Sequence, residues 1–379
     1  MTLNVALIRG RYDPFGGAER FVQNAVEALA AQGARLTLIT RKWPAHASAD
    51  PGIAPLLVDP FYLGSLWRDQ SFARAACEAV DRGNFDLVQS HERIACCDVY
   101  RAGDGVHAEW LAQRRRVQSP FKQLGVRLNP HHRYLLLAER ELFRSERLKA
   151  VICNSHMVKD EILRHFATPA QKLCVIHNSV DSQQFHPGLK DQQRANTRKA
   201  LRIAKSAPLF LFVGSGFERK GLIAFLMSLA ELPGDCRGVV VGKDKRMMAF
   251  QMFADELGLS ARVHFTGGVE DVRPYYAAAD VFVLPTLYDP FPNACLEAMA
   301  CGLPVVTSNK CGVAELIENG SNGWVCDALD TPRIAEAMQS CFAAAAQMGA
   351  AARQRVAALT PQHMAEQYLA LYRTLLAPT

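Results

Sequence analysis

Two adjacent cations in a glycine-rich stretch are the first residues whose types indicate chemistry. In VGSGFERKG (213–221), Arg219 and Lys220 stand between an apolar, strand-like segment and the helical pattern LIAFLMSLAEL. The N-terminus of a helix attracts anions through its dipole and its free N–H groups, and it repels cations. A cationic pair there predicts a bound diphosphate, while an exposed basic pair is the alternative. The stretch is not a Walker A loop, because it lacks the GxxxxGK[ST] spacing.

Two carboxylates occur in YDPFPNACLEAMACGLPVVTS, which begins at Tyr288. Asp289 lies in a predicted turn, and Glu297 lies about two turns into the helix that is expected to follow. A retaining glycosidase holds its two carboxyl groups about 5 Å apart, and this spacing does not suggest such a pair. An acidic residue beside a phosphate-binding helix suits sugar hydroxyls, so we expect the two side chains to contact different parts of one elongated ligand. Asp289 alone could instead be a turn or cap residue.

The letters YDPF occur twice, at 12–15 and at 288–291, each time after an apolar run and before a helical pattern. A chance match is one explanation. The other is that both copies form the turn from a strand into a helix, where ligands bind in an open α/β sheet. A further polar stretch, RAGDGVHAEW, places Asp104 and His107 after a short predicted strand, although a lone histidine is more often structural.

The elements that must position these residues alternate along the chain. Strands are predicted at 4–9, 35–40, 85–90, 149–155, 208–214, 237–242, 263–267, 280–285 and 303–308, with helical patterns that include 18–32 and 363–376. This alternation predicts an α/β fold with parallel sheets that are covered on both faces. A turn-rich break at 177–188 suggests domains at 1–180 and 181–360, and 361–379 is expected to form a helix that returns to the first domain.

The composition describes a soluble globular protein: of 379 residues, 49% are hydrophobic and 21% are charged. No apolar run has the roughly 18 residues of a membrane span, and the N-terminus lacks the basic region of a signal peptide. The 11 cysteines include no CxxC pair, and the adjacent Cys96 and Cys97 are poorly placed to bridge each other or to bind zinc. We therefore expect reduced, core-like cysteines and a cytoplasmic protein. The net charge of +6 identifies no partner by itself.

Several motifs occur in an order that is typical of one family. They are G-x-x-x-x-RKG, then F-x-G, then [DE]-x-F-x-x-x-x-x-E-A-M-A-x-G-x-P-V-V-x-[ST], with FGGAER and DVYRAGDGVHAEW in the N-terminal half. In these motifs the chain resembles the retaining glycosyltransferases of family 4, and among them the enzymes that add glucose to the lipopolysaccharide core. The resemblance implies the GT-B fold: two Rossmann-like domains that face a central cleft, with a C-terminal helix packing back toward the N-terminal domain.

The resemblance also implies roles on the donor side. Arg219 and Lys220 would neutralise the leaving diphosphate, Glu297 would hold the ribose hydroxyls, and Asp289 would hold a hydroxyl of the hexose. Further donor contacts would come from helix starts, at Gly16, Gly17, Asn293 and Ala294. Two departures concern the donor sugar: Asp289 replaces the family's commoner Glu, and Pro292, which has no N–H, stands where the family often has Gly.

On the acceptor side, the resemblance implies that Asp104 orients or deprotonates the acceptor hydroxyl and that His107 lies beside the reacting sugar. The HER at 91–93, which follows a predicted strand, would line the acceptor pocket. The implied reaction moves a hexose, glucose first, from a UDP-sugar to a lipopolysaccharide core or another lipid-linked glycan. Attack on the front face, with the leaving phosphate taking the acceptor proton, would retain the configuration. Because fixed cations and helix amides can stabilise the diphosphate, and no DxD motif is present, we predict no metal and no cofactor.

Three alternatives share some of these features. A sugar-nucleotide epimerase or hydrolase of GT-B fold would need no acceptor, and a nucleotide-sugar-binding protein would need no catalysis. A basic scaffold on a membrane surface is the third, although Arg219, Lys220 and Glu297 argue against it. Nucleic-acid binding is not expected, because no RNA or DNA module is recognisable.

The segment 107–133 is basic, with aromatic and aliphatic residues interspersed and a single glutamate. A solvated basic loop is one interpretation. The other is a surface that rests on anionic lipid at the inner face of the bacterial inner membrane and presents a lipid-linked acceptor. The residues that would contact the membrane are Trp110, Arg114, Arg115, Arg116, Phe121, Lys122 and Arg127.

Overall fold

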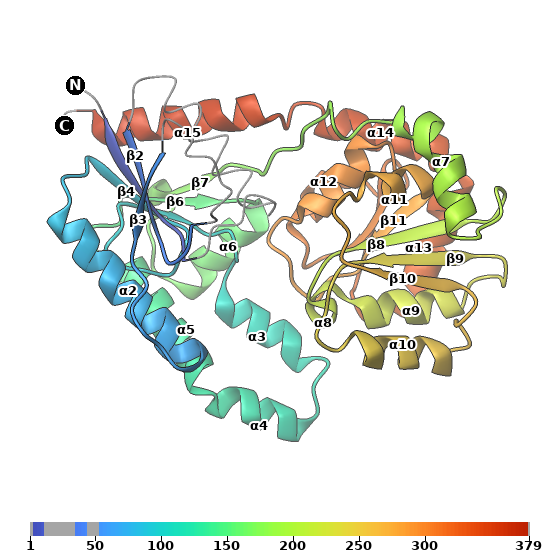
Figure 1. The fold of residues 1–379 in the computed structure, drawn as a ribbon, viewed down its shortest axis with the longest axis horizontal. Helices are drawn as coiled ribbons and strands as arrows, with labels where there is room; N and C mark the ends of the chain where they lie inside the picture. The colour runs from blue at the N-terminus through green and yellow to red at the C-terminus, as the bar shows by residue number, and fades with distance from the viewer. Residues whose placement is uncertain (1–2, 11–34, 44–52, 378–379) are drawn as a thin grey trace. The chain divides into compact units, whose positions relative to one another are not determined.

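The computed structural model describes residues 3–10, 35–43 and 53–377, and its chain forms two compact units (Figure 1). Unit 1 comprises residues 1–178 together with 361–379, and unit 2 comprises residues 179–360. The division falls between Asn178 and Ser179, inside the turn-rich stretch of the sequence. Each unit is built on its own sheet, so each is described by itself.

In its described part, unit 1 holds a parallel sheet with the strand order β3-β2-β1-β4-β5-β6-β7. Its strands are β1 Asn4–Ile8, β2 Arg35–Thr40, β3 Ile53–Leu57, β4 Leu87–Ser90, β5 Val99–Arg101, β6 Ala150–Cys153 and β7 Leu173–Val175. The order reverses between β1 and β4, and the crevice at the carboxyl ends of such a strand pair is where open α/β sheets bind ligands.

Unit 2 holds a second parallel sheet, with the order β10-β9-β8-β11-β12-β13. Its strands are β8 Leu209–Val213, β9 Arg237–Val241, β10 Val263–Gly267, β11 Val281–Leu284, β12 Val305–Ser308 and β13 Gly323–Cys326. Here the order reverses between β8 and β11. Both sheets therefore have the arrangement of a Rossmann-like fold, and the prediction of two such α/β domains is confirmed.

Helices cover these sheets. In unit 1 they are α2 Gly64–Arg82, α3 His107–Arg115, α4 Pro120–Leu128, α5 Pro130–Arg144, α6 His156–His165 and α15 Pro361–Leu376. In unit 2 they are α7 Leu189–Ala200, α8 Phe217–Lys220, α9 Leu222–Ala230, α10 Met247–Glu256, α11 Arg273–Ala278, α12 Asn293–Ala300, α13 Thr331–Ala343 and α14 Ala345–Val356. None of the helices in the described ranges combines the length and the apolar content needed to cross a membrane.

Strand β1 illustrates why the sheet of unit 1 needs helices on both faces. Successive side chains of a strand point to opposite faces, and all four residues from Val5 to Ile8 are buried. Val5 and Leu7 pack in one apolar cluster with Tyr368 and Tyr372 of α15, whereas Ala6 and Ile8 belong to a second cluster that includes side chains of α2. A strand that is buried on both faces reads as a continuous apolar run in the sequence.

The C-terminal helix α15 packs on the sheet of unit 1, as predicted (Figure 1, red helix). Two polar contacts fix it there. The Tyr372 hydroxyl donates to Gln89 Oε1 at 2.6 Å, and Arg101 Nε donates to the Tyr368 hydroxyl at 3.2 Å. The last element of the chain therefore completes the core of the first unit.

Three edge strands were not predicted from the sequence, namely β3, β7 and β13. β7 and β13 have only three and four residues, and β3 contains a proline, so their apolar periodicity is weak. The interpretation of 107–133 as a loop is wrong, because the segment forms α3, α4 and the start of α5. The first YDPF, Gly16, Gly17 and the helix expected at 18–32 lie outside the described residues.

The expectation that all cysteines are reduced is also wrong for one pair. Cys77 in α2 and Cys96 in the loop after β4 form a disulfide, with their Cα atoms 5.7 Å apart. Only the adjacent Cys96 and Cys97 were considered from the sequence, whereas the partner lies 19 residues earlier on a helix. The other cysteines of the described residues are free, and most are buried.

One buried cation holds α7 in unit 2. The Arg198 guanidinium is 2% exposed and forms an ion pair with Asp280 at 2.7 Å. It also donates to the carbonyl oxygens of Ala278, Ala204, Lys205 and Ala207, at 2.9 to 3.1 Å. A buried charge of this kind is stable only while its partners remain.

We predict that Arg198→Met lowers the free energy of unfolding of unit 2 by about 3 kcal/mol, because it removes one of the two arginines that pair with Asp280 and the guanidinium donor to four carbonyl groups. Urea denaturation followed by circular dichroism measures the loss. Lys199→Met, at the exposed neighbouring position, is the matched control and should unfold like the wild type. Equal midpoints for the Arg198 variant and the wild type would contradict the prediction.

Candidate active-site residues in each unit

In unit 2, the turn that carries the two predicted cations is held against the loop after β11. Gly221 has φ +78°, and a Cβ atom there would lie 1.9 Å from the carbonyl oxygen of Pro285, so only glycine fits. The carbonyl oxygen of Arg219 accepts from Leu287 N at 2.9 Å and from Thr286 Oγ1 at 2.8 Å. These contacts join the carboxyl ends of β8 and β11, where the strand order reverses.

Lys220 and Asp289 form an ion pair, with the lysine side chain 13% and the carboxylate 7% exposed. The backbone of Asp289 is fixed as well, since its N–H donates to the Lys310 carbonyl at 2.9 Å and its own carbonyl accepts from Gly312 N at 2.8 Å. Among the described residues, the Arg219 guanidinium has no hydrogen-bond or ion-pair partner. The structure thus brings a paired and an unpaired cation together at one strand switch.

The position of the cations differs in one detail from the prediction. Arg219 and Lys220 end the short helix α8, and Gly221 separates them from the N-terminus of α9. They are therefore not residues of α9 itself. The left-handed conformation of Gly221 breaks the helix at this point, a conformation that the glycine in the sequence allows but does not require.

The second YDPF lies between β11 and α12, as predicted for a strand-to-helix turn. Asn293 and Ala294 are the first residues of α12, with Pro292 at its N-cap. Glu297 is therefore the fifth residue of the helix, one turn in rather than two. Its Oε2 accepts from the hydroxyl of Tyr276 at 2.9 Å, and that hydroxyl lies 3.2 Å from the Ala294 carbonyl.

Burial raises the pKa of Tyr276 well above its usual value, and Glu297 raises it further, so this hydroxyl stays protonated. It can therefore donate to the Glu297 carboxylate at any ordinary pH. That hydrogen bond fixes the orientation of Glu297, whose fixed oxygens can accept hydrogen bonds from a ligand. Tyr276 was not recognised from the sequence as part of this site.

A pocket of about 490 Å³ lies at the carboxyl ends of β8, β9 and β10 in unit 2. It is lined by Val213, Gly214, Ser215, Val241, Gly242, Lys243, Gly268, Val269, Glu270 and Val272. Glycine backbone and valine side chains make most of this wall, which suits a flat, partly apolar group such as a nucleobase. This pocket was not predicted from the sequence. The available signal was the two strand ends VVVGKD and FTGGVE, in which apolar strands run into glycine and charged residues.

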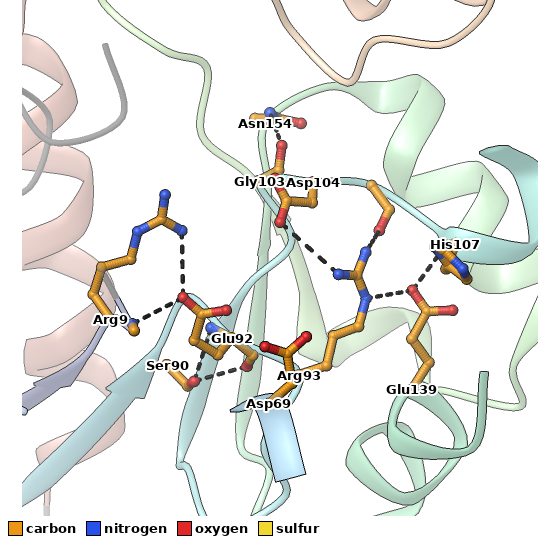
Figure 2. A network of polar contacts seen from close by, with 12 residues as sticks. Arg9, Asp69, Ser90, Glu92, Arg93, Gly103, Asp104, His107, Glu139 and Asn154 are labelled. Carbon is orange, nitrogen blue, oxygen red and sulfur yellow. Dashed lines mark hydrogen bonds and ion pairs between the residues drawn. The ribbon is translucent and has the colours of Figure 1, made fainter. Parts of the chain in front are cut away.

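In unit 1, the loops after β1 and β4 meet through Glu92 (Figure 2). Glu92 Oε1 accepts from Gly10 N at 3.0 Å and lies 3.7 Å from the Arg9 guanidinium. The turn after β4 is closed by Ser90, whose hydroxyl donates to the Glu92 carbonyl at 2.7 Å and accepts from Glu92 N at 3.0 Å. The HER stretch is thereby held at the strand switch of unit 1.

Arg93 connects this turn to both acceptor-side candidates (Figure 2). Its Nε donates to Glu139 Oε1 at 2.8 Å, and its Nη2 donates to the Gly105 carbonyl at 3.2 Å. The carboxylate of Asp104 lies 3.9 Å from Arg93 Nη1 and is 64% exposed. Glu139 Oε1 also accepts from His107 N at 2.8 Å. Asp104 and His107 are therefore brought together by one arginine and one buried carboxylate.

His107 is neutral over the ordinary pH range. Burial is the main cause that lowers its pKa to about 3, and the positive charge of Arg93 and the neighbouring His132 and His131 lower it further. Its Nε2 lies 3.0 Å from Nδ1 of His132, so the two rings share one hydrogen bond. A neutral imidazole in this position can orient a hydroxyl group but adds no positive charge to the site.

A pocket of about 590 Å³ opens beside this network. Its walls include Gly10, Lys42, Tyr62, Glu92, Arg93, Asp104 and Tyr134, together with side chains of α2. Cations, carboxylates and tyrosines are mixed in this lining, which suits a hydroxyl-rich ligand that also carries charge. It lies at the carboxyl ends of β1 and β4, where the fold places ligands.

Glu139 and His132 were not identified from the sequence. Both lie on α5, and Glu139 is 1% exposed although it is charged. The available signal was the pattern RYLLLAERELF, in which Glu139 falls on the apolar face of the predicted helix. A charged residue at such a position indicates a buried partner.

Two family models match the chain. "Glycosyltransferase Family 4" matches residues 15–184, and "Glycosyl transferases group 1" matches residues 193–355. The first match spans most of unit 1 and the second most of unit 2. The second contains the polar residues described above for unit 2, and the first contains those of unit 1 except the end of β1 with Arg9 and Gly10.

Individual proteins are similar over most or part of the chain. Lipopolysaccharide glucosyltransferase WaaG of Escherichia coli is 28% identical over 332 residues, which cover 85% of this chain and 84% of the relative. Lipopolysaccharide core biosynthesis glycosyltransferase LpsE of Rhizobium meliloti is 34% identical over 146 residues, or 38% of this chain and 43% of the relative.

Solved structures show the same fold. The crystal structure of WaaG superposes with a TM-score of 0.82 at 24% identity, covering 96% of this chain and 99% of that one. Anabaena HepE in complex with UDP-glucose superposes with a TM-score of 0.75 at 19% identity, covering 98% and 100%.

We predict that His107 makes the protein less stable in mild acid. The folded state holds this ring neutral down to a pKa of about 3, whereas an unfolded histidine takes up a proton near pH 6.5. The unfolded state therefore binds more protons between these values, and the free energy of unfolding falls as the pH falls from about 6.5 toward 3, by at most about 1.4 kcal/mol per pH unit. In urea denaturation at several pH values, His107→Gln should lose less stability than the wild type. A difference between the two proteins that is independent of pH would contradict this.

Proposed function

This chain belongs to the family 4 glycosyltransferases with the GT-B fold, and from that premise we propose that it transfers glucose from UDP-glucose to a lipopolysaccharide core or another lipid-linked glycan. One observation carries the proposal: Arg219, Lys220 and Asp289 meet at the strand switch of unit 2, beside the start of α12. The two cations suit the diphosphate of a sugar nucleotide, and the carboxylate suits the hydroxyl groups of its sugar. The similarity to WaaG and LpsE supports the choice of donor sugar and acceptor.

The donor site stabilises the charge of the departing diphosphate. The unpaired Arg219 and the N-terminal amides of α12, at Asn293 and Ala294, provide fixed donors for phosphate oxygens. Lys220 shares its charge between the phosphate and Asp289, so Asp289 is placed to hold a hexose hydroxyl beside it. Glu297, fixed by Tyr276, holds the ribose hydroxyls. In this mechanism the fixed cations replace a metal ion.

The acceptor enters the pocket beside Arg93 in unit 1. Asp104, whose carboxylate is 64% exposed, is the group that orients the acceptor hydroxyl, and neutral His107 stays close to the reacting sugar. The hydroxyl attacks from the side on which the diphosphate leaves, and the leaving phosphate takes its proton. The configuration at the transferred carbon is thereby retained, and no side chain acts as a nucleophile.

The acceptor pocket also bears on the rival activities. An epimerase or hydrolase would use the donor site alone and would need no second sugar-sized pocket. The pocket of about 590 Å³ in unit 1, lined by both carboxylates and cations, is of the size that holds a small ligand. It therefore supports transfer to an acceptor rather than epimerisation, hydrolysis or simple binding of the nucleotide sugar.

A lipid-linked acceptor requires the protein to work at a membrane, and α3 and α4 supply a surface for this. Phe121 and Leu128 are 89% and 65% exposed, and they accompany the cations at 114–116, Lys122 and Arg127. Exposed apolar side chains beside cations are typical of helices that lie on anionic bilayers. Peripheral attachment to the inner face of the bacterial inner membrane is the location we propose.

The reaction itself is tested with purified protein, UDP-glucose and lipopolysaccharide that lacks its outer core, in the presence of excess EDTA. We predict transfer of glucose with the anomeric configuration of the donor, detected by mass spectrometry and NMR. UDP-galactose and UDP-N-acetylglucosamine serve as competing donors. Release of free glucose without transfer would indicate a hydrolase, and activity that is abolished by EDTA and restored by Mg²⁺ would show that the cations do not replace a metal.

The diphosphate site is tested by Arg219→Ala and Lys220→Ala. Each should lower kcat/KM for UDP-glucose by about 100-fold or more, as expected when a fixed donor to developing charge is lost. Lys199→Ala, at an exposed position on α7, is the control and should keep wild-type activity. Near-normal kcat/KM in both variants would exclude this mechanism.

Membrane attachment is tested by sedimentation with vesicles. Binding should rise with the anionic lipid content and fall with salt, because each cation near an anionic surface contributes about 1 kcal/mol that salt screens. Replacing Arg114, Arg115 and Arg116 with Glu should release the protein, whereas reversing three exposed cations of unit 2, Lys199, Arg202 and Lys205, should not. A wild-type protein that ignores anionic vesicles at low salt would refute this part of the proposal.

A further inference from the structure

A second pocket of unit 1 lies under α4, between α3 and α5, and has a volume of about 510 Å³. Figure 1 shows α3 and α4 extending away from the sheet of this unit. The pocket is lined by Leu111, Arg115, Pro120, Gln123, Leu124, Val126, Arg127, His132, Arg133 and Leu136. Half of these residues are apolar, three are arginines, and none carries a carboxylate.

The three arginines of this pocket have no acidic partner among the described residues. Arg115 Nε reaches only the carbonyl of Leu111 on its own helix, at 3.4 Å. The guanidinium groups of Arg127 and Arg133 have no hydrogen-bond or ion-pair partner in the described part of the chain. This differs from the acceptor pocket, where Asp69, Glu92 and Asp104 offset the cations. Three uncompensated cations around one concave surface favour an anion.

Helix α4 leaves this pocket accessible. None of its residues is buried, and Leu124, which lines the pocket, is 54% exposed. Two hydrogen bonds attach the helix to its neighbours, from Gln123 Nε2 to the carbonyls of Arg115 at 3.1 Å and Gln118 at 2.9 Å. Leu124 therefore belongs both to the wall of the pocket and to the exposed apolar residues of α4.

We propose that this pocket binds one molecule of an anionic phospholipid, with its phosphate on Arg115, Arg127 and Arg133 and the first methylene groups of its chains against Leu111, Leu124 and Leu136. Free phosphate would satisfy the arginines but leave the apolar wall in water, so an amphiphile fits the lining better. The inference rests on the proposed function only in assuming that the protein reaches a bilayer. It adds a saturable site for one lipid molecule to a surface that would otherwise bind anionic membranes only by nonspecific electrostatic attraction.

The pocket is connected to the candidate catalytic histidine through a hydrogen bond between two rings. His132 lines the pocket, and its Nδ1 lies 3.0 Å from Nε2 of His107. The two rings are tilted by 31° with their centroids 5.1 Å apart. An anion beside His132 changes the electrostatic potential at the shared hydrogen bond. Lipid in the pocket would therefore alter the environment of the His107 ring.

The site is tested with dihexanoyl phosphatidylglycerol, used as monomers below its micelle concentration so that no membrane surface is present. Calorimetry should show saturable binding of one lipid per protein, with dihexanoyl phosphatidylcholine and inorganic phosphate at least about tenfold weaker. Arg127→Ala and Arg133→Ala should each weaken binding by about tenfold or more, as expected for loss of a charge-assisted contact. Arg140→Ala and Arg144→Ala remove exposed cations of α5 that do not line the pocket, and they should leave binding unchanged.

NMR of the histidine rings locates the bound lipid. Addition of the phosphatidylglycerol should shift the ring signals of His132 and His107, and Arg127→Ala should abolish the shift. Binding that is weakened equally by all four substitutions would overturn the proposal, and so would binding without a change in the His132 signals. Either result would indicate nonspecific electrostatic attraction. Binding of inorganic phosphate as tight as that of the lipid would show a phosphate site without a lipid. The outcome is independent of the transfer assay, so either proposal can fail while the other holds.

Discussion

The polar network of unit 1 depends on one buried carboxylate. Glu139 is 1% exposed, and a charge in such a place is tolerated only when donors surround it. The donors come from two distant loops, since Arg93 Nε follows β4 and His107 N begins α3 after β5, both at 2.8 Å from the same oxygen. One atom of α5 thereby sets the distance between the HER turn and the turn that carries Asp104. If these two turns moved apart, the Glu139 carboxylate would lose its hydrogen-bond donors in an apolar interior. These contacts therefore maintain the shape of the pocket beside Arg93.

In unit 2 the loops at the strand switch are held together mainly by backbone contacts rather than by a buried carboxylate. The RKG turn approaches the loop after β11 so closely that Gly221 has no room for a side chain, and the Arg219 carbonyl is bonded twice to that loop. The ion pair of Lys220 and Asp289 then joins the ends of the two strands at the side-chain level. In both units, polar contacts across the strand switch fix loops that carry the candidate residues, while the apolar strands beneath provide the rigid base.

Much of the fold could be predicted from the sequence because the strands are buried on both faces and read as apolar runs. The strands at 35–40 and 263–267 were located to the residue, and α12 follows the second YDPF as expected. The prediction of the family from its motifs is confirmed by the two family models. The edge strand β10 was located, whereas β3, β7 and β13 were missed, because β7 and β13 are very short and β3 is interrupted by a proline.

The candidate site was less predictable, because its contacts join residues that are far apart in the sequence. Arg93 and Glu139 are 46 positions apart, and Lys220 and Asp289 are 69 apart. Local patterns gave the identity of Arg219, Lys220, Asp289 and Glu297 but not which of them pair.

The disulfide between Cys77 and Cys96 has a consequence for the width of the acceptor pocket. One wall of that pocket is formed by α2, through Arg68, Asp69 and Phe72, and the opposite wall includes Glu92, Arg93 and Ile94. Cys77 lies further along α2, beyond the first wall, and Cys96 follows Ile94 of the second wall by two residues. In the oxidised protein the two walls are covalently joined and their spacing is fixed, whereas in a reducing compartment only packing holds them together. The width of this pocket is thus linked to the redox state in which the protein is kept.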